Sequence, residues 1–278
     1  MKAIFIVLIT ILAFASHGQS PWVAEKGSGY AQLGFTTIGP YSSLYLSDGG
    51  SYNLTREVTD QTVQLYGEYG LGNNTSILSS IPIKMMKTGE IQNPVATPNE
   101  QGSFTTLGNL QLAARHNFIN SKVVFSGQLT AELPTAGDDE ATGLRGGLDA
   151  FSIIPSLSVG KGLNKFYGYL SSGVAIRTND YSSDFRLSGE VGYKLIDRVY
   201  LILVLDVVEN FENGNAVVSD NQLQTGLYLN NQSFFAYGFK GSIGFTDNIG
   251  ITGAYYGASS GNVVAKSPSV NFGVYFKW

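Results

Sequence analysis

The sequence of 278 residues contains no cysteine, which excludes disulfide scaffolds, thiolate metal sites and cysteine nucleophiles. Charged residues make up only 14% of the chain, well below the roughly 25% of ordinary soluble domains. The formal net charge of −4 gives no basic footprint for nucleic acid, which is not expected as a partner. Beyond the N-terminus no apolar run reaches the ~18 residues that suggest a membrane-spanning helix. Glycine (34), tyrosine (16) and phenylalanine (16) are abundant instead, and the aromatic content favours strands.

The first 18 residues have the features of a secretory signal peptide. Lys2 is followed by an apolar run over 3–15, interrupted only by Thr10, and then by the small residues Ser16 and Gly18. We expect cleavage after Gly18, export of the mature protein, and one mature domain over 19–278. An uncleaved membrane anchor is the alternative.

The rest of the chain is built from segments of about 10–14 residues in which apolar and polar side chains alternate, the period of a strand with two different faces. In 185–195 the apolar side chains occupy odd positions and the charged ones even positions, and 270–278 alternates in the same way. Arg186, Glu190 and Lys194 would also align on a helix, but the intervening glycines and the strict alternation favour a strand.

Segment length separates a membrane barrel from a soluble sandwich. Sandwich strands average about 5–6 residues, whereas a strand that crosses a membrane needs about 9–11. Tight connections such as 72–74 also alternate with long polar stretches such as 39–59, as in barrels with short periplasmic turns and longer extracellular loops. The sequence therefore predicts an all-β fold, a transmembrane antiparallel up-and-down β-barrel.

Thirteen segments qualify as strands, beginning near Tyr30, Gln61, Thr75, Phe104, Lys122, Gly147, Lys165, Ser183, Val199, Gln222, Ser233, Asn248 and Ser269. A single-chain barrel with both termini in the periplasm needs an even number. The segment 222–229 is short and lies within the polar stretch 211–232, so we interpret it as an arm of an extracellular hairpin. Twelve strands are expected, with ten or fourteen as alternatives.

The C-terminus ends on an aromatic residue after alternating apolar positions. Tyr275, Phe276 and Trp278 resemble the assembly signal that outer-membrane barrels present to their insertion machinery. An ordinary last strand that happens to end in tryptophan is the alternative. The expected partners are therefore the lipid bilayer, the insertion machinery and a small-molecule solute.

Charged side chains gather on the face opposite the lipid, as they must when a charge near the bilayer midplane costs about 2–4 kcal/mol. The candidates for the lumen wall are Glu68, Lys84, Arg115, Glu132, Arg177, Arg186, Glu190, Lys194, Asp206, Lys240 and Lys277. Their basic excess predicts a wet pore that prefers anions; the alternative is that opposite charges pair and brace a narrow barrel. Arg186 and Lys194 must find partners across the lumen or in water, and either could pair laterally with Asp206 or Glu209.

The bulk of the lumen side chains leaves the same two alternatives open. Small residues on this face would leave space for a channel, namely Ser156, Ser158, Ser171, Gly173, Ala175 and Ser188. Tyr66, Tyr167 and Tyr169 would fill it.

Enzymatic activity is not expected, and the sequence predicts no catalytic residues, metal or cofactor. His116, the single histidine after the signal peptide, falls on the lipid side of its strand, away from the serine and acid that a hydrolase needs. Asp138, Asp139 and Glu140 form a consecutive run in one loop, best interpreted as solvated, with weak binding of a divalent cation as the alternative. No phosphate-binding loop or dinucleotide fingerprint is present in the sequence.

Three motifs give the chain, from Tyr66 to Trp278, a resemblance to a known family. They are the glycine-rich strand and turn 67–74 running into Ser79–Ile83, the stretch 108–115, and the stretch 128–137 with its Leu-Pro-Thr-Ala-Gly end. This pattern is similar to the family of outer-membrane transporters associated with the meta-pathway of phenol degradation. The resemblance implies a barrel that passes small, often hydrophobic molecules, and it brings no established binding residues.

The long-chain fatty-acid transporters, a related family, carry an N-terminal hatch of some tens of residues inside the lumen. Here only about ten residues separate Gln19 from the first strand, which argues against capture of a hydrophobic ligand by such a hatch. The sequence thus predicts a passive channel or transporter for small molecules, including hydrophobic or aromatic compounds, in the outer membrane of a Gram-negative bacterium. The alternative is a structural or surface-interaction barrel with a closed lumen.

Overall fold

The computed structural model describes residues 20–278, so the signal peptide expected over 1–18 lies outside the described residues. The described chain forms strands β1 Gly29–Tyr45, β2 Ser51–Gly72, β3 Thr75–Ile91, β4 Gly102–Leu107, β5 Leu110–Asn120, β6 Val124–Leu133, β7 Asp138–Asp139, β8 Leu144–Arg145, β9 Ser152–Leu163, β10 Phe166–Arg177, β11 Asp184–Ile196, β12 Val199–Asn210, β13 Ser233–Gly244, β14 Ile249–Asn262, β15 Val264–Ala265 and β16 Ser269–Lys277, and the helix α1 Asp220–Leu223. A helix of the length and apolarity that a membrane crossing requires does not occur between residues 20 and 278.

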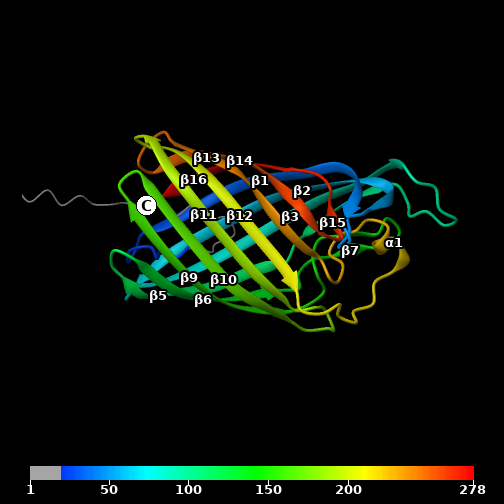
Figure 1. The fold of residues 1–278 in the computed structure, drawn as a ribbon, viewed down its shortest axis with the longest axis horizontal. Helices are drawn as coiled ribbons and strands as arrows, with labels where there is room; N and C mark the ends of the chain where they lie inside the picture. The colour runs from blue at the N-terminus through cyan, green and yellow to red at the C-terminus, as the bar shows by residue number, and fades with distance from the viewer. Residues whose placement is uncertain (1–19) are drawn as a thin grey trace, which may run out of the picture.

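Twelve of these strands close into one antiparallel barrel (Figure 1). Each of them pairs with the next barrel strand along the chain, and β1 closes the wall by pairing with β2 on one side and β16 on the other. The short strands β4 and β15 extend the wall beside β3 and β1, while β7 and β8 form a separate small ribbon. The all-β barrel and its twelve strands are confirmed.

The two faces of the wall are the reverse of those in a soluble protein. On β11 the inward Glu190 is only 2% exposed, whereas the next residue, Val191, faces outward and is 55% exposed. On β9 the buried Ser158 lies between the exposed Leu157 and Val159. An apolar exterior around a polar interior is the pattern of a barrel that lies in lipid, where lipid-facing and lumen-facing residues alternate.

The two ends of the barrel differ, and we call them the turn end and the loop end. At the turn end the connections are tight: Gly72, Asn73 and Asn74 link β2 to β3 with φ values of 94°, 50° and 57°. Glycine and asparagine tolerate this left-handed region best, which explains why they occur in the turn. The long connections lie at the loop end. The C-terminus lies at the turn end, where Gly29 and Trp278 exchange backbone hydrogen bonds of 3.0 and 3.1 Å.

Several strand positions differ from the sequence-based expectation. β2 begins at Ser51 rather than near Gln61, because its first half continues to pair with β1, for instance Ser51 with Tyr45. The strand expected near Gly147 begins at Ser152. Residues 146–147 pack closely against Asn109 and Ala136 instead of pairing in the wall.

The strand expected near Phe104 is divided into β4 and β5. Opposite this break β3 carries Pro82, which has no backbone N–H to donate. The Gly108 N–H still donates to the Pro82 carbonyl at 2.8 Å, and β3 pairs with β4 on one side of this point and with β5 on the other.

The segment 222–229 is not the arm of a hairpin. Its beginning belongs to α1, whose N-terminal Ser219 and Gln222 form a capping box: the Ser219 side chain accepts from the Gln222 N–H, and the Gln222 side chain accepts from the Ser219 N–H. Reciprocal capping of this kind satisfies two backbone donors at a helix start. The expected hairpin arm is therefore wrong, although its exclusion from the twelve strands is right.

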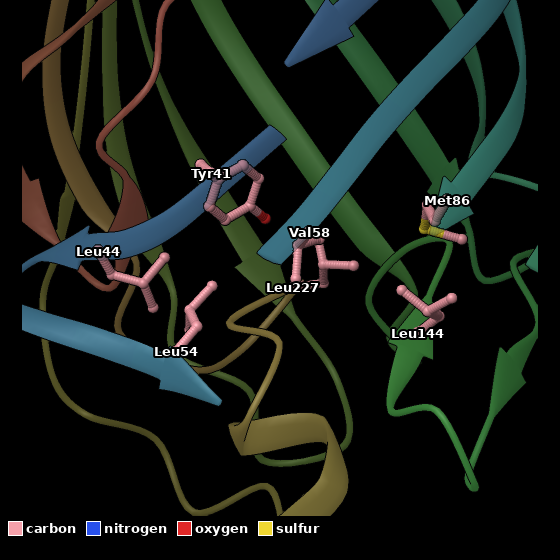
Figure 2. Close-up of a cluster of buried hydrophobic side chains, with 7 residues drawn as sticks. All are labelled: Tyr41, Leu44, Leu54, Val58, Met86, Leu144 and Leu227. Atoms are coloured by element: carbon pink, nitrogen blue, oxygen red, sulfur yellow. The ribbon is translucent and has the colours of Figure 1, made fainter. Parts of the chain in front are cut away.

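A hydrophobic core lies at the loop end. Figure 2 shows this loop-end cluster, which comprises Tyr41, Leu44, Leu54, Val58, Met86, Leu144 and Leu227. Strands β1, β2 and β3 supply five of these side chains, β8 supplies Leu144, and Leu227 follows α1. The long connection 211–232 is also attached to the β7–β8 ribbon, because Arg145 Nη1 of β8 donates to the Tyr228 carbonyl at 3.1 Å. Loops packed in this way cover the loop end of the barrel.

Candidate functional site: the barrel lumen

The lumen holds a large cavity toward the loop end. Its volume is about 550 Å³, and its wall carries seven charged side chains, namely Asp60, Lys84, Glu132, Arg177, Asp184, Arg186 and Asp206. Serine, threonine and glutamine side chains of the strands line the remainder together with a few rings such as Tyr228 and Tyr256. We call this space the upper cavity.

A second, smaller cavity lies nearer the turn end and has a volume of about 90 Å³. Gln32, Tyr66, Lys240 and Thr252 are among the side chains around it. We call it the lower cavity.

The chain's own N-terminal segment, 20–28, fills the lumen at the turn end. The Trp22 ring is buried and packs edge-on against Tyr167 and Tyr169, with 5.8 Å between ring centroids in each case. Glycine makes room for the segment: a Cβ on Gly70 would lie 2.0 Å from the Glu25 carbonyl oxygen. A long hatch is thus not needed to fill this part of the lumen, because the short segment 20–28 occupies it.

Arg115 links this segment to the wall. Its Nη1 donates to the Trp22 carbonyl at 2.8 Å and lies 3.3 Å from Glu68 Oε2. The Ala24 N–H also donates to Ser76 Oγ on β3 at 2.9 Å. Arg115 and Glu68, both predicted for the lumen wall, therefore help to hold the segment 20–28 at the turn end of the lumen.

Most of the predicted lumen charges lie in pairs. Lys84 contacts Asp60 at 2.6 Å, and Lys240 contacts Glu190 at 3.1 Å. Arg177 and Arg186 both pair with Asp184, Arg186 at 2.7 Å. Pairing across buried positions is what the bracing alternative expected.

The pairing of Arg186 and Lys194 differs from the expectation. Arg186 bonds Asp184 on its own strand rather than Asp206 or Glu209, because Asp184 lies only two residues away on the same face. Lys194 bonds Asp197 in the following turn at 2.7 Å, and this bond lowers the pKa of the exposed Asp197 below its ordinary value.

The remaining candidates have different surroundings. Glu132 accepts from Gln111 Nε2 at 2.7 Å beside the upper cavity. Lys277 lies at the turn end with its ammonium 4.7 Å from the Tyr275 ring centroid. Asp206 lines both cavities, and within residues 20–278 its carboxylate makes no hydrogen bond or ion pair.

The basic excess predicted for the lumen does not hold around the upper cavity. Asp60 and Asp184 are not among the predicted lumen charges, and with them the wall has four carboxylates and three cations. Both residues lie next to the strand starts expected near Gln61 and Ser183, where alternation is weak evidence. Their parity was nevertheless a usable signal, since Asp60 is in phase with Glu68 and Asp184 with Arg186.

Small residues and tyrosines divide the lumen between them. Ser156 and Ser188 line the upper cavity, whereas Tyr167 and Tyr169 pack around Trp22 at the turn end. The sequence left open whether small residues leave space in the lumen or tyrosines fill it. The first holds toward the loop end and the second toward the turn end.

The residues considered for catalysis or metal binding lie elsewhere. His116 is exposed on the outer face, where its ring nitrogen lies 2.9 Å from Thr75 Oγ1. In the loop, Asp139 Oδ1 accepts from the backbone N–H groups of Ala141 and Thr142 at 3.1 and 3.3 Å, so this carboxylate stabilises a turn. In the described chain no three histidine or acidic side chains are grouped so that they could hold a metal ion.

The aromatic C-terminus is divided between the two faces. Phe276 and Trp278 are exposed on the outside and stack at 5.8 Å, whereas Tyr275 points inward and stacks on Tyr30, also at 5.8 Å. An outer aromatic pair at a strand end is typical of the girdle at a membrane interface.

Comparison with solved structures supports the architecture. A COG4313 outer membrane channel from Pseudomonas putida F1 matches with a TM-score of 0.72 at 11% identity, covering 92% of this chain and 98% of that one. The NanC porin matches with a TM-score of 0.52 at 8% identity, covering 89% of this chain and 100% of that one. The translocator domain of autotransporter NalP from Neisseria meningitidis matches with a TM-score of 0.50 at 10% identity, covering 92% and 90%. No protein-family profile and no curated protein matches the sequence. At these identities the likeness is one of fold.

Proposed function

We propose that the protein is a passive channel in the outer membrane of a Gram-negative bacterium and that it passes small molecules through its lumen. The observation that carries the proposal is the upper cavity, about 550 Å³ of space inside the wall with polar and charged side chains around it. A polar lumen of this kind holds water, and charges around it act on whatever solute enters. The structurally similar proteins described as a channel and a porin support the same class.

Export and insertion are part of the proposal. Residues 1–18 direct the chain across the inner membrane and are removed. The aromatic end, with Tyr275, Phe276 and Trp278, is presented to the insertion machinery, and the apolar exterior then lies in the bilayer. No enzymatic step is proposed.

The solutes are small. The lower cavity of about 90 Å³ and the N-terminal segment around Trp22 restrict the path toward the turn end, which becomes the periplasmic end. The rings of Tyr228, Phe234 and Tyr256 around the upper cavity suit flat, weakly polar compounds, and this supports the aromatic solutes that the family resemblance implies.

A surface-interaction barrel is the second candidate. The loop-end cluster covers one end, and Trp22 with its tyrosine partners fills the other, as a closed barrel requires. The extracellular loops would then carry the function.

Liposome swelling separates the two candidates. Mature protein is reconstituted and the liposomes are placed in isotonic solutes of rising size, from glycerol and amino acids to disaccharides and larger sugars. The channel predicts fast swelling with the smallest solutes and a steep fall with size. Absence of swelling with every solute, for protein shown to be folded, would favour the surface-interaction barrel.

A further inference from the structure

Four side chains from four strands separate the upper cavity from the lower one. Thr36 of β1, Gln64 of β2, Asp206 of β12 and Tyr256 of β14 each line both cavities. A solute that moves from one cavity to the other therefore passes these four groups. We call them the neck.

Asp206 differs from the other carboxylates of the lumen because it has no protein partner in the described chain. Asp60, Glu68, Asp184 and Glu190 are each paired with lysine or arginine, and Glu132 accepts from an amide. A carboxylate that is partly removed from water and left unpaired is costly, and a bound cation or water removes that cost.

The charges near Asp206 leave its negative charge uncompensated. Its charged neighbours are Glu190 and Lys240. Lys240 Nζ lies 3.1 Å from Glu190 Oε1, so the electrostatic effects of these two opposite charges on more distant groups largely cancel. With Asp206 ionised, the neck therefore carries a net charge of −1, which attracts cations and repels anions.

We propose that the neck is a binding site for a small cation and that Asp206 makes the channel select cations over anions. The carboxylate supplies the charge. The Gln64 amide oxygen and the Thr36 hydroxyl are further acceptors, and the Tyr256 ring suits an ammonium group through its π face. The lower cavity is about three times the roughly 30 Å³ that one water occupies in the liquid, so an alkali ion with its water or a small alkylammonium ion fits.

This inference rests on the proposed function, because selectivity is expressed only if solutes pass the neck. It also replaces the preference for anions that the sequence predicted. The seven basic candidates outnumbered four acids in that prediction, but in the structure the neck contains one acid and no base.

The test compares Asp206→Asn with Glu209→Gln in planar bilayers. Both substitutions lie on β12 and remove one negative charge with almost no change of shape, but Glu209 is exposed on the opposite face. Reversal potentials in a potassium chloride gradient give the cation-to-anion permeability ratio. Wild type and Glu209→Gln should prefer potassium. In Asp206→Asn the ratio should fall about 25-fold, because one unit charge met at about 4 Å in water changes the permeability to the cation and to the anion about fivefold each, in opposite directions. An unchanged ratio in Asp206→Asn overturns the inference.

Replacing potassium by methylammonium or tetraethylammonium distinguishes the kinds of cation. Methylammonium currents through wild type comparable to those of potassium assign a site that accepts alkylammonium ions, whereas a large drop restricts it to inorganic cations. Tetraethylammonium should be excluded by size. Equal currents with tetraethylammonium would contradict the narrow neck.

A second measurement does not depend on conduction. Crystals soaked in rubidium bromide should show an anomalous rubidium peak at the Asp206 carboxylate in wild type and Glu209→Gln, none there in Asp206→Asn, and no bromide peak in the neck. A rubidium peak in a protein that conducts no ions would reject the channel but keep the site. Conduction without a rubidium peak and without an effect of Asp206→Asn would reject the site but keep the channel.

Discussion

Arg115 on β5 donates to the carbonyl oxygen of Trp22 at 2.8 Å and lies 3.3 Å from Glu68 on β2. One buried guanidinium thus joins two wall strands to the N-terminal segment inside the lumen. The Trp22 ring packs against the uncharged Tyr167 and Tyr169, and Arg115 adds a charged hydrogen bond that fixes this segment to the wall.

Arg115→Ala should loosen the N-terminal segment and raise single-channel conductance. It also leaves Glu68 as an unpaired buried charge, and breaking a buried pair from one side costs about 3–5 kcal/mol. Arg198→Ala is the control, since the Arg198–Asp247 pair is exposed and such pairs contribute about 0–1 kcal/mol. Conductance and urea unfolding measure both effects. Equal behaviour of the two variants would show that Arg115 does not hold the segment.

The Lys84–Asp60 pair should show the asymmetry of buried ion pairs. Lys84→Met alone leaves Asp60 uncompensated and should destabilise the barrel by about 3–5 kcal/mol, whereas the double variant with Asp60→Leu should recover most of that loss. Urea unfolding of the reconstituted protein measures the difference. A double variant as unstable as Lys84→Met would mean that the pair itself, rather than the avoidance of a lone charge, stabilises the wall.

The aromatic end should matter for assembly more than for the folded barrel. Deleting 276–278 is expected to lower strongly the amount of protein recovered in the outer membrane, because the insertion signal is lost. Phe272→Ala, at an exposed outward position of the same strand, should leave the yield nearly unchanged. If both variants give the wild-type amount, the C-terminus is an ordinary last strand.

The exported protein should begin at or near Gln19 and should be heat-modifiable. Closed barrels resist detergent until boiled, so unboiled and boiled samples should migrate differently on gels. Mass spectrometry of the outer-membrane form locates its first residue. Retention of Met1, or recovery of the protein in the soluble periplasm, would contradict the signal-peptide prediction.

The sequence predicts the wall well because alternation is local. The outward Val191 beside the inward Glu190 lies where the period of two puts it. The need for an even number of strands, with every tight turn at one end, leads to twelve. The same logic is weaker at strand ends: Asp60 and Asp184 lie next to the strand starts expected near Gln61 and Ser183, are not among the predicted lumen charges, and are partners of lumen cations.

The parts that the sequence did not predict depend on long-range contacts. Nothing in the spacing of 20–28 indicates that Trp22 packs between tyrosines of β10, because those tyrosines are far away along the chain. The helix α1 is an exception, because Ser219 and Gln222 have the spacing of a capping box, which is a local signal for a helix start. The sequence-based expectation places the start of an extended segment at Gln222 instead.

Whether ions pass through the lumen is tested most directly by blocking it chemically, which the cysteine-free sequence permits. Ser156 lines the upper cavity, and its neighbour Leu157 faces outward and is 54% exposed. Single-channel currents are recorded for Ser156→Cys and Leu157→Cys before and after a charged methanethiosulfonate reagent is added. If ions pass through the lumen, the current of Ser156→Cys falls while that of Leu157→Cys is unchanged. Currents that the reagent leaves unaltered in Ser156→Cys, despite modification confirmed by mass, would contradict passage through the lumen.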